Sequence, residues 1–398
     1  MADVKIYAEL VDERAREQIE TLASLPAFAD SKIRIMPDVH AGAGCVIGFT
    51  ADLGDKVIPN VVGVDIGCGM LTIELGKIAI DYDKLDSVIR TYIPSGRNVR
   101  AEAVPDVPDL ERLHCYDQLK EKGWLRRSVG TLGGGNHFIE IDRDDEENLY
   151  LVIHTGSRNL GKQVADLYQK TAIEVMKGRD AYLAECERVK KEYKLAGRQK
   201  EIQKTLNALK KAYEKAEPGI PAALCYLEDN YRRMYLDDMA FCQDFAMLNR
   251  SWIAKIICEK MGWDIHNAFT TVHNYIDMET NIVRKGAVSA RKGERLLIPM
   301  NMRDGSLICT GKGNDDWNQS APHGAGRLMS RAQARRMLNM DDYAKSMDGI
   351  YTTSVTTETI DEAPMAYKPM EQIVSLIGET AEIERVIRPV YNFKAAED

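Results

Sequence analysis

Long apolar runs are absent from this chain of 398 residues. No window approaches the roughly 18 apolar residues that a membrane span needs, and the first 20 residues carry charges throughout instead of the apolar stretch of a signal peptide. Cys-x-x-Cys pairs are also absent. The eight cysteines are scattered, which argues against a zinc ribbon and fits a reducing compartment. We therefore expect a cytoplasmic protein without a membrane anchor.

An excess of positive charge is lacking as well, since 53 lysines and arginines stand against 61 acidic residues and give a formal net charge of −8. Domains that coat nucleic acids by bulk electrostatics are usually basic, so any nucleic-acid site here must be a local basic patch. The chain shows no internal repeat and no low-complexity linker. We expect a single catalytic domain over residues 1–398.

The periodicity of apolar residues changes along the chain. Residues 32–74 are typical of short buried strands joined by turns with glycine and proline, residues 149–153 predict another strand, and strands resume over residues 295–310. Between about residues 163 and 261 the spacing is helical, which predicts a helical insertion, and a further helix is expected over residues 327–338. The predicted fold class is α+β, with a β-rich core, surrounding helices and the helical insertion.

Five of the seven histidines stand beside glycines or at strand ends, where catalytic groups are common. Asp65 and Cys68 share a glycine-punctuated turn, and His137, His154 and His273 each lie at the edge of a tight segment. These side chains suffice for two metal ions if one ligand is shared, as the thiolate of Cys68 could be. Each histidine alone is more often structural, and thiolate and imidazole ligands by themselves favour zinc or iron. The residues alone leave the metal open.

His323 lies in a different setting, the glycine-containing segment 318–327 ahead of the predicted helix. Small residues there let backbone N–H groups approach a phosphate, and a helix N-terminus favours anions. Arg327, Arg331 and Arg335 recur every four residues, so one helix face could line a phosphate-bearing cleft. A solvated basic helix behind a glycine turn would explain the same pattern.

Two further segments give weaker signals. Residues 130–135 are rich in glycine but lack the Lys-Ser/Thr of a P-loop and the glycine spacing of a dinucleotide fingerprint. Residues 188–215 hold ten lysines or arginines against three glutamates, with Leu206, Leu209 and Tyr213 at helical spacing. This basic amphipathic stretch could grip an RNA backbone, or it could be a solvated helical hairpin.

Seven short motifs follow one another along the chain: Met36-Pro37-Asp38-Val39-His40, Asp65-Ile66-Gly67-Cys68-Gly69-Met70, Gly135-Asn136-His137-Phe138, His154-Thr155-Gly156-Ser157-Arg158, His273-Asn274-Tyr275, His323-Gly324-Ala325-Gly326-Arg327 and Asp361-Glu362-Ala363-Pro364. Together they resemble the RtcB-type RNA-splicing ligases, which join 3′-phosphate ends to 5′-hydroxyl ends. The match runs from about Met36 to Lys394. Collinear motifs in this number are far more specific than any one of them.

The resemblance implies the RtcB-like fold and a centre of two manganese ions. Its implied ligands are Asp65, Cys68, His137, His154 and His273, with Cys68 shared between the ions.

The resemblance also implies that GTP is the co-substrate and that His323 becomes guanylylated, with Asp38 orienting its ring. GMP would then pass to an RNA 3′-phosphate, made where necessary by opening a 2′,3′-cyclic phosphate, and the 5′-hydroxyl would attack. The implied nucleotide contacts are Asn136, Phe138, Glu140, Ser306, Gly324, Ala325, Gly326, Arg327, Tyr367 and Lys394.

The sequence departs from the family pattern in one place. Family members generally carry a Gly-Ser-Met-Gly-Thr stretch ahead of the nucleophile, where this chain has Met300-Asn301-Met302-Arg303-Asp304. This bulkier, charged segment suggests a divergent bacterial branch that works in RNA repair. The expected partners are GTP and RNA with the ends described above, with no membrane and no obligatory protein partner.

Two other function classes fit part of the pattern. A metal-dependent phosphodiesterase or cyclic-phosphate hydrolase would need the same metal ligands but no nucleotide-linked histidine, so His323 separates it from a ligase. A non-catalytic RNA-binding accessory of translation rescue would be expected to have lost metal ligands, all of which are present here.

Overall fold

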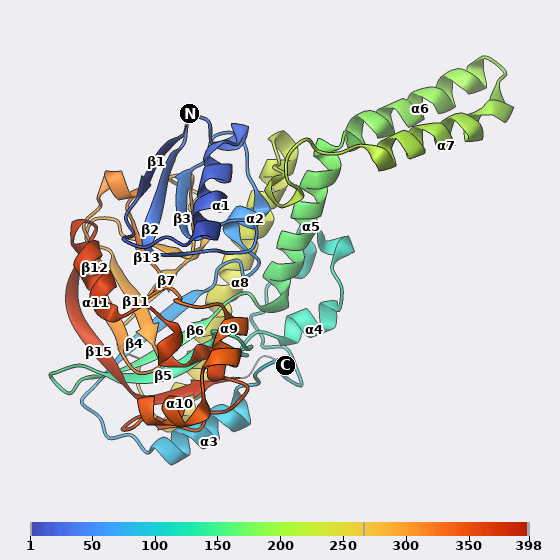
Figure 1. The fold of residues 1–398 in the computed structure, drawn as a ribbon. Helices are drawn as coiled ribbons and strands as arrows, with labels where there is room; N and C mark the ends of the chain where they lie inside the picture. The colour runs from blue at the N-terminus through green and yellow to red at the C-terminus, as the bar shows by residue number, and fades with distance from the viewer. Residues whose placement is uncertain (1, 266, 396–398) are drawn as a thin grey trace.

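The computed structural model describes residues 2–265 and 267–395. Its strands gather on one side, and the long helices α5 and α8 run along the other (Figure 1). The strands are β1 (Asp3–Ile6), β2 (Lys32–His40), β3 (Ile47–Asp52), β4 (Gly69–Gly76), β5 (Phe138–Arg143), β6 (Leu149–Thr155), β7 (Asn267–Val272), β8 (Asn274–Ile276), β9 (Ile282–Lys285), β10 (Ala287–Ser289), β11 (Arg295–Asn301), β12 (Gly305–Gly311), β13 (Ser320–Pro322), β14 (Tyr351–Thr352) and β15 (Ala381–Lys394). The helices are α1 (Glu13–Ala23), α2 (Pro59–Val62), α3 (Tyr82–Tyr92), α4 (Lys122–Arg127), α5 (Arg158–Met176), α6 (Arg179–Leu195), α7 (Gln199–Lys215), α8 (Asp229–Met261), α9 (Arg331–Met337), α10 (Met340–Ser346) and α11 (Met370–Leu376). The predicted α+β class is confirmed.

The largest sheet runs in the order β11-β12-β15-β5-β6-β4-β7, and a second sheet runs β1-β2-β3-β9-β8. Strand β15 joins two groups of strands, because its first half pairs with β12 and its second half pairs with β5. A short ribbon of β10 and β13 carries the chain toward His323. Residues that are far apart in sequence are thereby brought to one place.

Strand β6 is buried at every position, as its continuous apolar run predicts for a strand that is covered on both faces. Leu151 and Ile153 belong to the same apolar cluster as Ile257 of α8. Tyr150 and Val152, which point the other way, belong to a cluster with residues of β11 and β12. The sheet therefore has one face against α8 and one face toward its own interior, where the candidate site lies.

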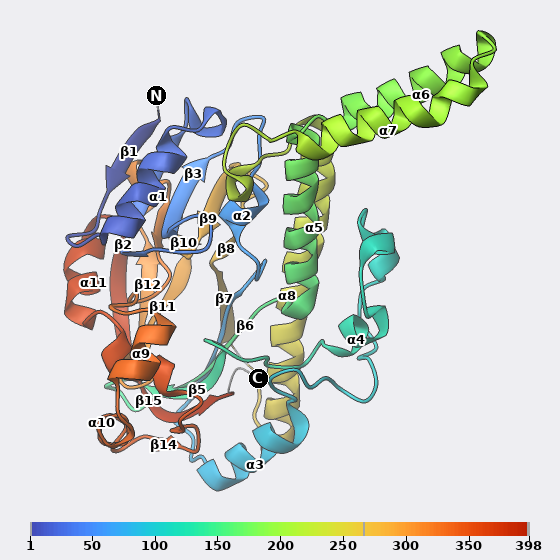
Figure 2. The same ribbon diagram turned by 45° about the vertical axis from the view of Figure 1, so that its right-hand side comes forward.

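The region predicted to be helical holds α5, α6, α7 and α8. Helix α8 packs along the sheet, whereas α6 and α7 form a hairpin that projects from the body (Figure 2). None of the helices in the described ranges has a stretch both long and apolar enough to cross a bilayer.

The helix expected over residues 327–338 begins later than predicted. Helix α9 starts at Arg331 because the hydroxyl of Ser330 accepts the N–H of Gln333 and completes a capping box there. Gly326 has a φ of +74°, and Arg327 forms an isolated antiparallel bridge with Tyr367. Arg327 thus lies in extended chain, outside the helix.

Candidate active site

Five predicted ligands meet at one edge of the large sheet. Cys68 directly precedes β4, His154 is the sixth residue of β6, and His273 directly follows β7. His137 directly precedes β5, which pairs with β6. Because β5, β6, β4 and β7 are neighbours and antiparallel, these chain positions fall at the same edge.

The donor atoms form two triplets that share Cys68: one with His154 and His273, and one with Asp65 and His137. The Sγ atom lies 3.3 Å from Nε2 of His154 and 3.5 Å from Nε2 of His137. Nε2 of His154 lies 3.4 Å from Nε2 of His273, and Nε2 of His137 lies 3.0 Å from a carboxylate oxygen of Asp65. Such crowding of lone-pair donors in a buried place suits cations between them.

Backbone carbonyls set the orientation of two imidazoles. Nδ1 of His137 lies 2.9 Å from the carbonyl oxygen of Leu132, and Nδ1 of His154 lies 3.1 Å from that of Asn136. A carbonyl can only accept, so each Nδ1 carries the proton and each Nε2 keeps its lone pair toward the cluster. This is the tautomer that a metal ligand requires.

Electrostatics favour the ligand forms of His154 and Asp65 but oppose the thiolate form of Cys68. Burial, followed by the neighbouring imidazoles, lowers the pKa of His154 well below its usual value, so the ring is neutral near pH 7. Burial opposes ionisation of Asp65, but the hydrogen bond and charge of His137 hold its pKa below the ordinary range. Burial and then the charge of Asp65 raise the pKa of the Cys68 thiol, so a bound cation is needed to hold it as thiolate. One carboxylate, one thiolate and three imidazoles fit two cations with a shared sulfur.

His323 follows β13 and is held by Asp38 of β2. One carboxylate oxygen of Asp38 accepts both the Nδ1–H of His323, at 2.6 Å, and its backbone N–H, at 3.1 Å. Asp38 is fully buried. Strand β2 is fixed at this point because Nζ of Lys368 donates to the carbonyls of Pro37 and Val39, each at 3.1 Å. The arrangement leaves Nε2 of His323 with a free lone pair.

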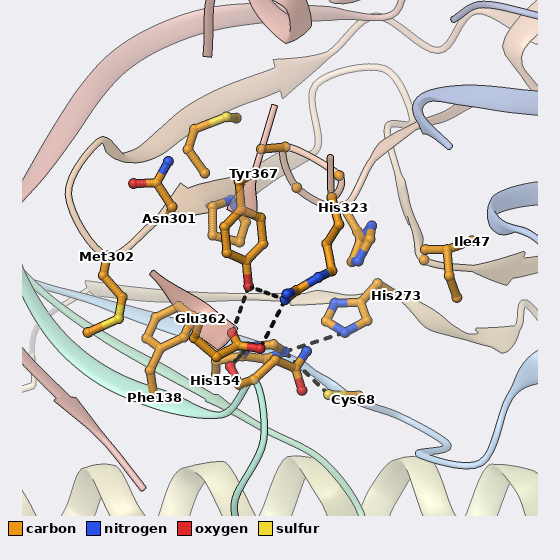
Figure 3. Close-up of a pocket in the computed structure, with 18 of the residues that line it drawn as sticks. Ile47, Cys68, Phe138, His154, His273, Asn301, Met302, His323, Glu362 and Tyr367 are labelled. Atoms are coloured by element: carbon orange, nitrogen blue, oxygen red, sulfur yellow. Dashed lines mark hydrogen bonds and ion pairs between the residues drawn. The ribbon is translucent and has the colours of Figure 1, made fainter. Parts of the chain in front are cut away.

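The imidazole of His323 lies beside the ligand cluster. Its ring centroid is 5.0 Å from that of His273, and both rings face the same space (Figure 3). That space is a cavity of about 330 Å³, large enough for a small-molecule ligand. Its lining includes nine of the ten predicted nucleotide contacts: Asn136, Phe138, Glu140, Gly324, Ala325, Gly326, Arg327, Tyr367 and Lys394.

The tenth predicted contact, Ser306, is not among the lining residues. It lies in β12 opposite Pro299 and Ile387, fully buried, and its hydroxyl has no partner among the described residues. The segment that departs from the family pattern does reach the cavity, through Met300, Asn301 and Met302.

Glu362 is a cavity residue that the motif contained but whose role sequence reasoning missed. Its carboxylate accepts from the hydroxyl of Tyr367 at 2.6 Å, from Nζ of Lys394 at 2.8 Å and from Arg327 at 3.1 Å (Figure 3). Burial opposes ionisation, yet the charges of Lys394, Arg331 and Arg327 hold its pKa at about 2. The acidic residues of the motif could have indicated a charged site. The basic partners of Glu362 could not be identified from the sequence, because Arg327 and Lys394 are more than thirty residues away from it.

The arginines that recur every four residues have a partner in the same acidic pair. Arg331 contacts the carboxylate of Glu362 at 3.7 Å, and Arg335 contacts that of Asp361 at 3.2 Å. Arg327 and Arg331 line the cavity, whereas Arg335 is not among its lining residues. The three arginines therefore do not form one face of a single helix as expected, because Arg327 precedes α9 and Arg335 does not line the cavity. The acidic pair partly balances their charges.

Comparison with known proteins places the chain in a family. The model of a family described as tRNA-splicing ligase RtcB matches residues 18–113 and 110–395. The chain is 30% identical over 430 residues to the RNA-splicing ligase RtcB of Escherichia coli K12, covering 98% of this chain and 96% of the relative. It is 27% identical over 486 residues to the tRNA-splicing ligase RtcB of Pyrobaculum aerophilum, covering 97% and 93%. The chain therefore belongs to the RtcB family.

Proposed function

We propose that this protein is an RNA ligase that joins 3′-phosphate or 2′,3′-cyclic phosphate ends to 5′-hydroxyl ends, with GTP as co-substrate and two manganese ions as cofactors. The observation that carries the proposal is the placement of His323, which is polarised by Asp38 and opens onto the same cavity as the ligand cluster. A hydrolase would have no use for this second, histidine-centred site. The family membership supports joining of RNA ends, since the relatives above are named RNA- or tRNA-splicing ligases.

In the proposed first step, Nε2 of His323 attacks the α-phosphorus of GTP. A nitrogen–phosphorus bond forms, the bond to the bridging oxygen breaks, and pyrophosphate leaves. The ring becomes cationic, and the carboxylate of Asp38 stabilises it while keeping the proton on Nδ1. Bound divalent ions would supply charge neutralisation at the phosphates and orient the attacking and leaving oxygens.

In the later steps, GMP passes from His323 to an oxygen of the RNA 3′-phosphate. This gives that phosphorus a good leaving group, so the 5′-hydroxyl can form the new phosphodiester and release GMP. Arg327, at the cavity wall, is placed to hold a phosphate oxygen.

We propose that the base of GTP lies between Phe138 and Tyr367, toward Glu140 and Lys394. Burial raises the pKa of Glu140 to about 7, so hydrogen bonds from a guanine edge would favour its ionised form. The departing segment does not bring a free charge here, because Arg303 pairs with the adjacent Asp304 at 2.7 Å. Thioether side chains from this segment would instead shape the wall of the nucleotide site.

The domain organisation, cellular location, biological role and partners of the protein stay predictions. We propose a single catalytic domain over residues 1–398, with the helices between about residues 163 and 261 as an insertion within it. We also propose a cytoplasmic location, a role in RNA repair, and activity without an obligatory protein partner.

Covalent labelling tests the proposal. Wild-type protein with manganese and α-labelled GTP should keep label after denaturation, the label should be lost in acid and survive alkali, and γ-labelled GTP should leave none. His323→Ala should take no label and join no RNA, yet it should seal RNA that already carries a 3′-guanylyl group. His114→Ala is the matched control, because His114 pairs with Asp237 on the surface. Cleavage of cyclic phosphates without any labelling would replace the ligase with a hydrolase.

A further inference from the structure

The hairpin of α6 and α7 stands apart from the rest of the molecule. It projects from the far end of α5, away from the sheets (Figure 2). Tyr182 of α6 and Tyr213 of α7 stack with centroids 4.7 Å apart and join the two helices, and the Tyr213 hydroxyl donates to Glu174 of α5 and ties the hairpin to that helix. Helix α7 has no fully buried residue, so it adds little to any apolar core. Because the hairpin contributes little to the stability of the fold, a binding role on its surface would explain its presence.

One face of α7 is a continuous stripe of lysines. Lys200, Lys204, Lys211 and Lys215 are all exposed. At about 100° per residue these positions fall within a sector of about 60°, and at about 1.5 Å per residue they extend over about 22 Å. We call these four residues the lysine stripe.

The lysine stripe has few counter-charges: Glu201 lies near enough to Lys204 for its pKa to be lowered by that charge, after the larger effect of its hydrogen bond with Arg198. None of its four ammonium groups makes a salt bridge within the described ranges. The two glutamates of α7 are paired elsewhere, Glu201 with Arg198 at 2.7 Å and Glu214 with Lys210 at 3.8 Å. Five lysines against two glutamates give α7 a formal charge of +3 in a chain whose net charge is −8.

Helix α6 has more of its basic residues in ion pairs. Arg188 pairs with Glu185 at 2.5 Å and with Glu192 at 2.8 Å, and Lys190 pairs with Glu187 at 2.5 Å. Each helix of the hairpin carries five basic residues. Among the described residues, two of those in α6 make no salt bridge (Lys191 and Lys194), whereas four of those in α7 make none and share one face. A surface that served solubility alone would have no need of this difference.

The position of the hairpin relates it to the candidate active site. Helix α5 begins at Arg158, directly after Ser157, whose backbone N–H donates to the carboxylate of Asp65. Its 19 residues span about 28 Å, so the base of the hairpin lies about that far along α5 from the ligand cluster. The lysine stripe, which extends outward from that base, is too far from the ligand cluster to touch a reacting end, so only the part of an RNA behind that end can reach it (Figure 2).

We propose that the lysine stripe binds the phosphate backbone of a base-paired RNA stem whose broken end lies in the cavity. The inference rests on the proposed function for the identity of the ligand. A stripe about 22 Å long runs beside several consecutive phosphates of one strand. Since it offers only ammonium groups, it reads charge and shape and not sequence. The arm selects substrates that have a stem over those that are short single strands.

Two double variants test the proposal with equal changes of charge. Lys204→Gln with Lys211→Gln removes half of the stripe, and Arg188→Gln with Lys190→Gln removes two paired charges from α6. Glutamine preserves helix propensity. Affinity for a 20-base-pair RNA stem-loop ending in a 3′-phosphate is measured between 50 and 200 mM salt, together with affinity for a six-nucleotide single strand with the same end.

The stripe variant should weaken stem binding and reduce the slope of log affinity against log salt by about 2. The α6 variant should keep the wild-type slope, and neither variant should change binding of the short strand. Equal slopes for the two variants on the stem would overturn the proposal. Joining of short strands by the wild type is measured in the same experiment. If the wild type joins none, the proposed ligase function is refuted, whereas the salt slopes still test stem binding.

Discussion

Replacement of Asp38 by asparagine separates the charge of this residue from its shape. In the wild type, one oxygen of Asp38 carries both hydrogen bonds to His323, and the other oxygen is buried without a partner among the described residues. Asparagine can place its carbonyl oxygen at the first position and its amide at the second. The geometry would then be kept, while the negative charge opposite the ring is lost.

The expected magnitude follows from that contact. A hydrogen bond to a charged group contributes about 1.5–3 kcal/mol, and the contact matters most when the ring becomes cationic during attack. At about 1.4 kcal/mol per tenfold change, labelling of His323 should slow by about 10-fold to 150-fold. The buried amide would also lack an acceptor, which costs about 1–3 kcal/mol of folding stability.

The assay is the rate of covalent labelling from α-labelled GTP, per folded molecule, with metal content and melting temperature measured in parallel. Asp238→Asn is the matched control: Asp238 is buried, accepts from two backbone N–H groups and from the hydroxyl of Tyr168, and lies outside the cavity. It should lose stability but label at the wild-type rate. Labelling of Asp38→Asn at the wild-type rate with full metal content would refute the role assigned to Asp38.

Three other substitutions have distinct expected outcomes. Cys68→Ala should remove bound manganese, measured by elemental analysis, because both donor triplets contain this sulfur; full metal content would contradict a shared ligand. Gly326→Ala should abolish labelling but keep the metals, since a Cβ there would lie 2.3 Å from the Asp38 carbonyl oxygen. The carboxyl of Glu362 has a pKa lowered from 4.5 to about 2, so it stabilises the fold above pH 4.5 by about 3 kcal/mol, and this is lost as pH falls toward 2. Glu362→Gln should therefore flatten acid unfolding followed by circular dichroism in that window, and an unchanged profile would refute this linkage.

The sequence predicted the fold class, which is confirmed, and it nominated the candidate ligands, which the structure brings together; both depend on local patterns. Cys68, His137 and His273 stand where an apolar run meets a turn, and such places become the ends of neighbouring strands. Which ends meet depends on strand order, and the sequence carries that only through the family resemblance. The proposal of manganese likewise comes from the resemblance, since the donor types alone favour softer ions.

Other features were beyond a local reading. The start of α9 depends on which residue caps the helix. Arg327 forms a β-bridge with Tyr367 and is therefore extended, so the helix begins only after Ser330. The spacing of arginines predicted a common face, but Glu362 and Asp361, which draw them together, are more than twenty residues away in sequence. The pairing state of the lysines in α7 also required the structure, because charge counts cannot show which carboxylates are already engaged.

The place of β15 in the large sheet constrains the order of assembly. Among the described strands it is the last to be synthesised, yet it lies between β12 and β5 and pairs residues separated by about 250 positions, such as Asn392 with Glu140. Contacts between such distant positions form slowly, because a long loop must close before they contribute. Until β15 is synthesised, the edges of β12 and β5 would have unpaired backbone N–H and C=O groups. The nascent chain would therefore need protection from edge-to-edge association until the strand that carries Lys394 inserts between them and completes the cavity.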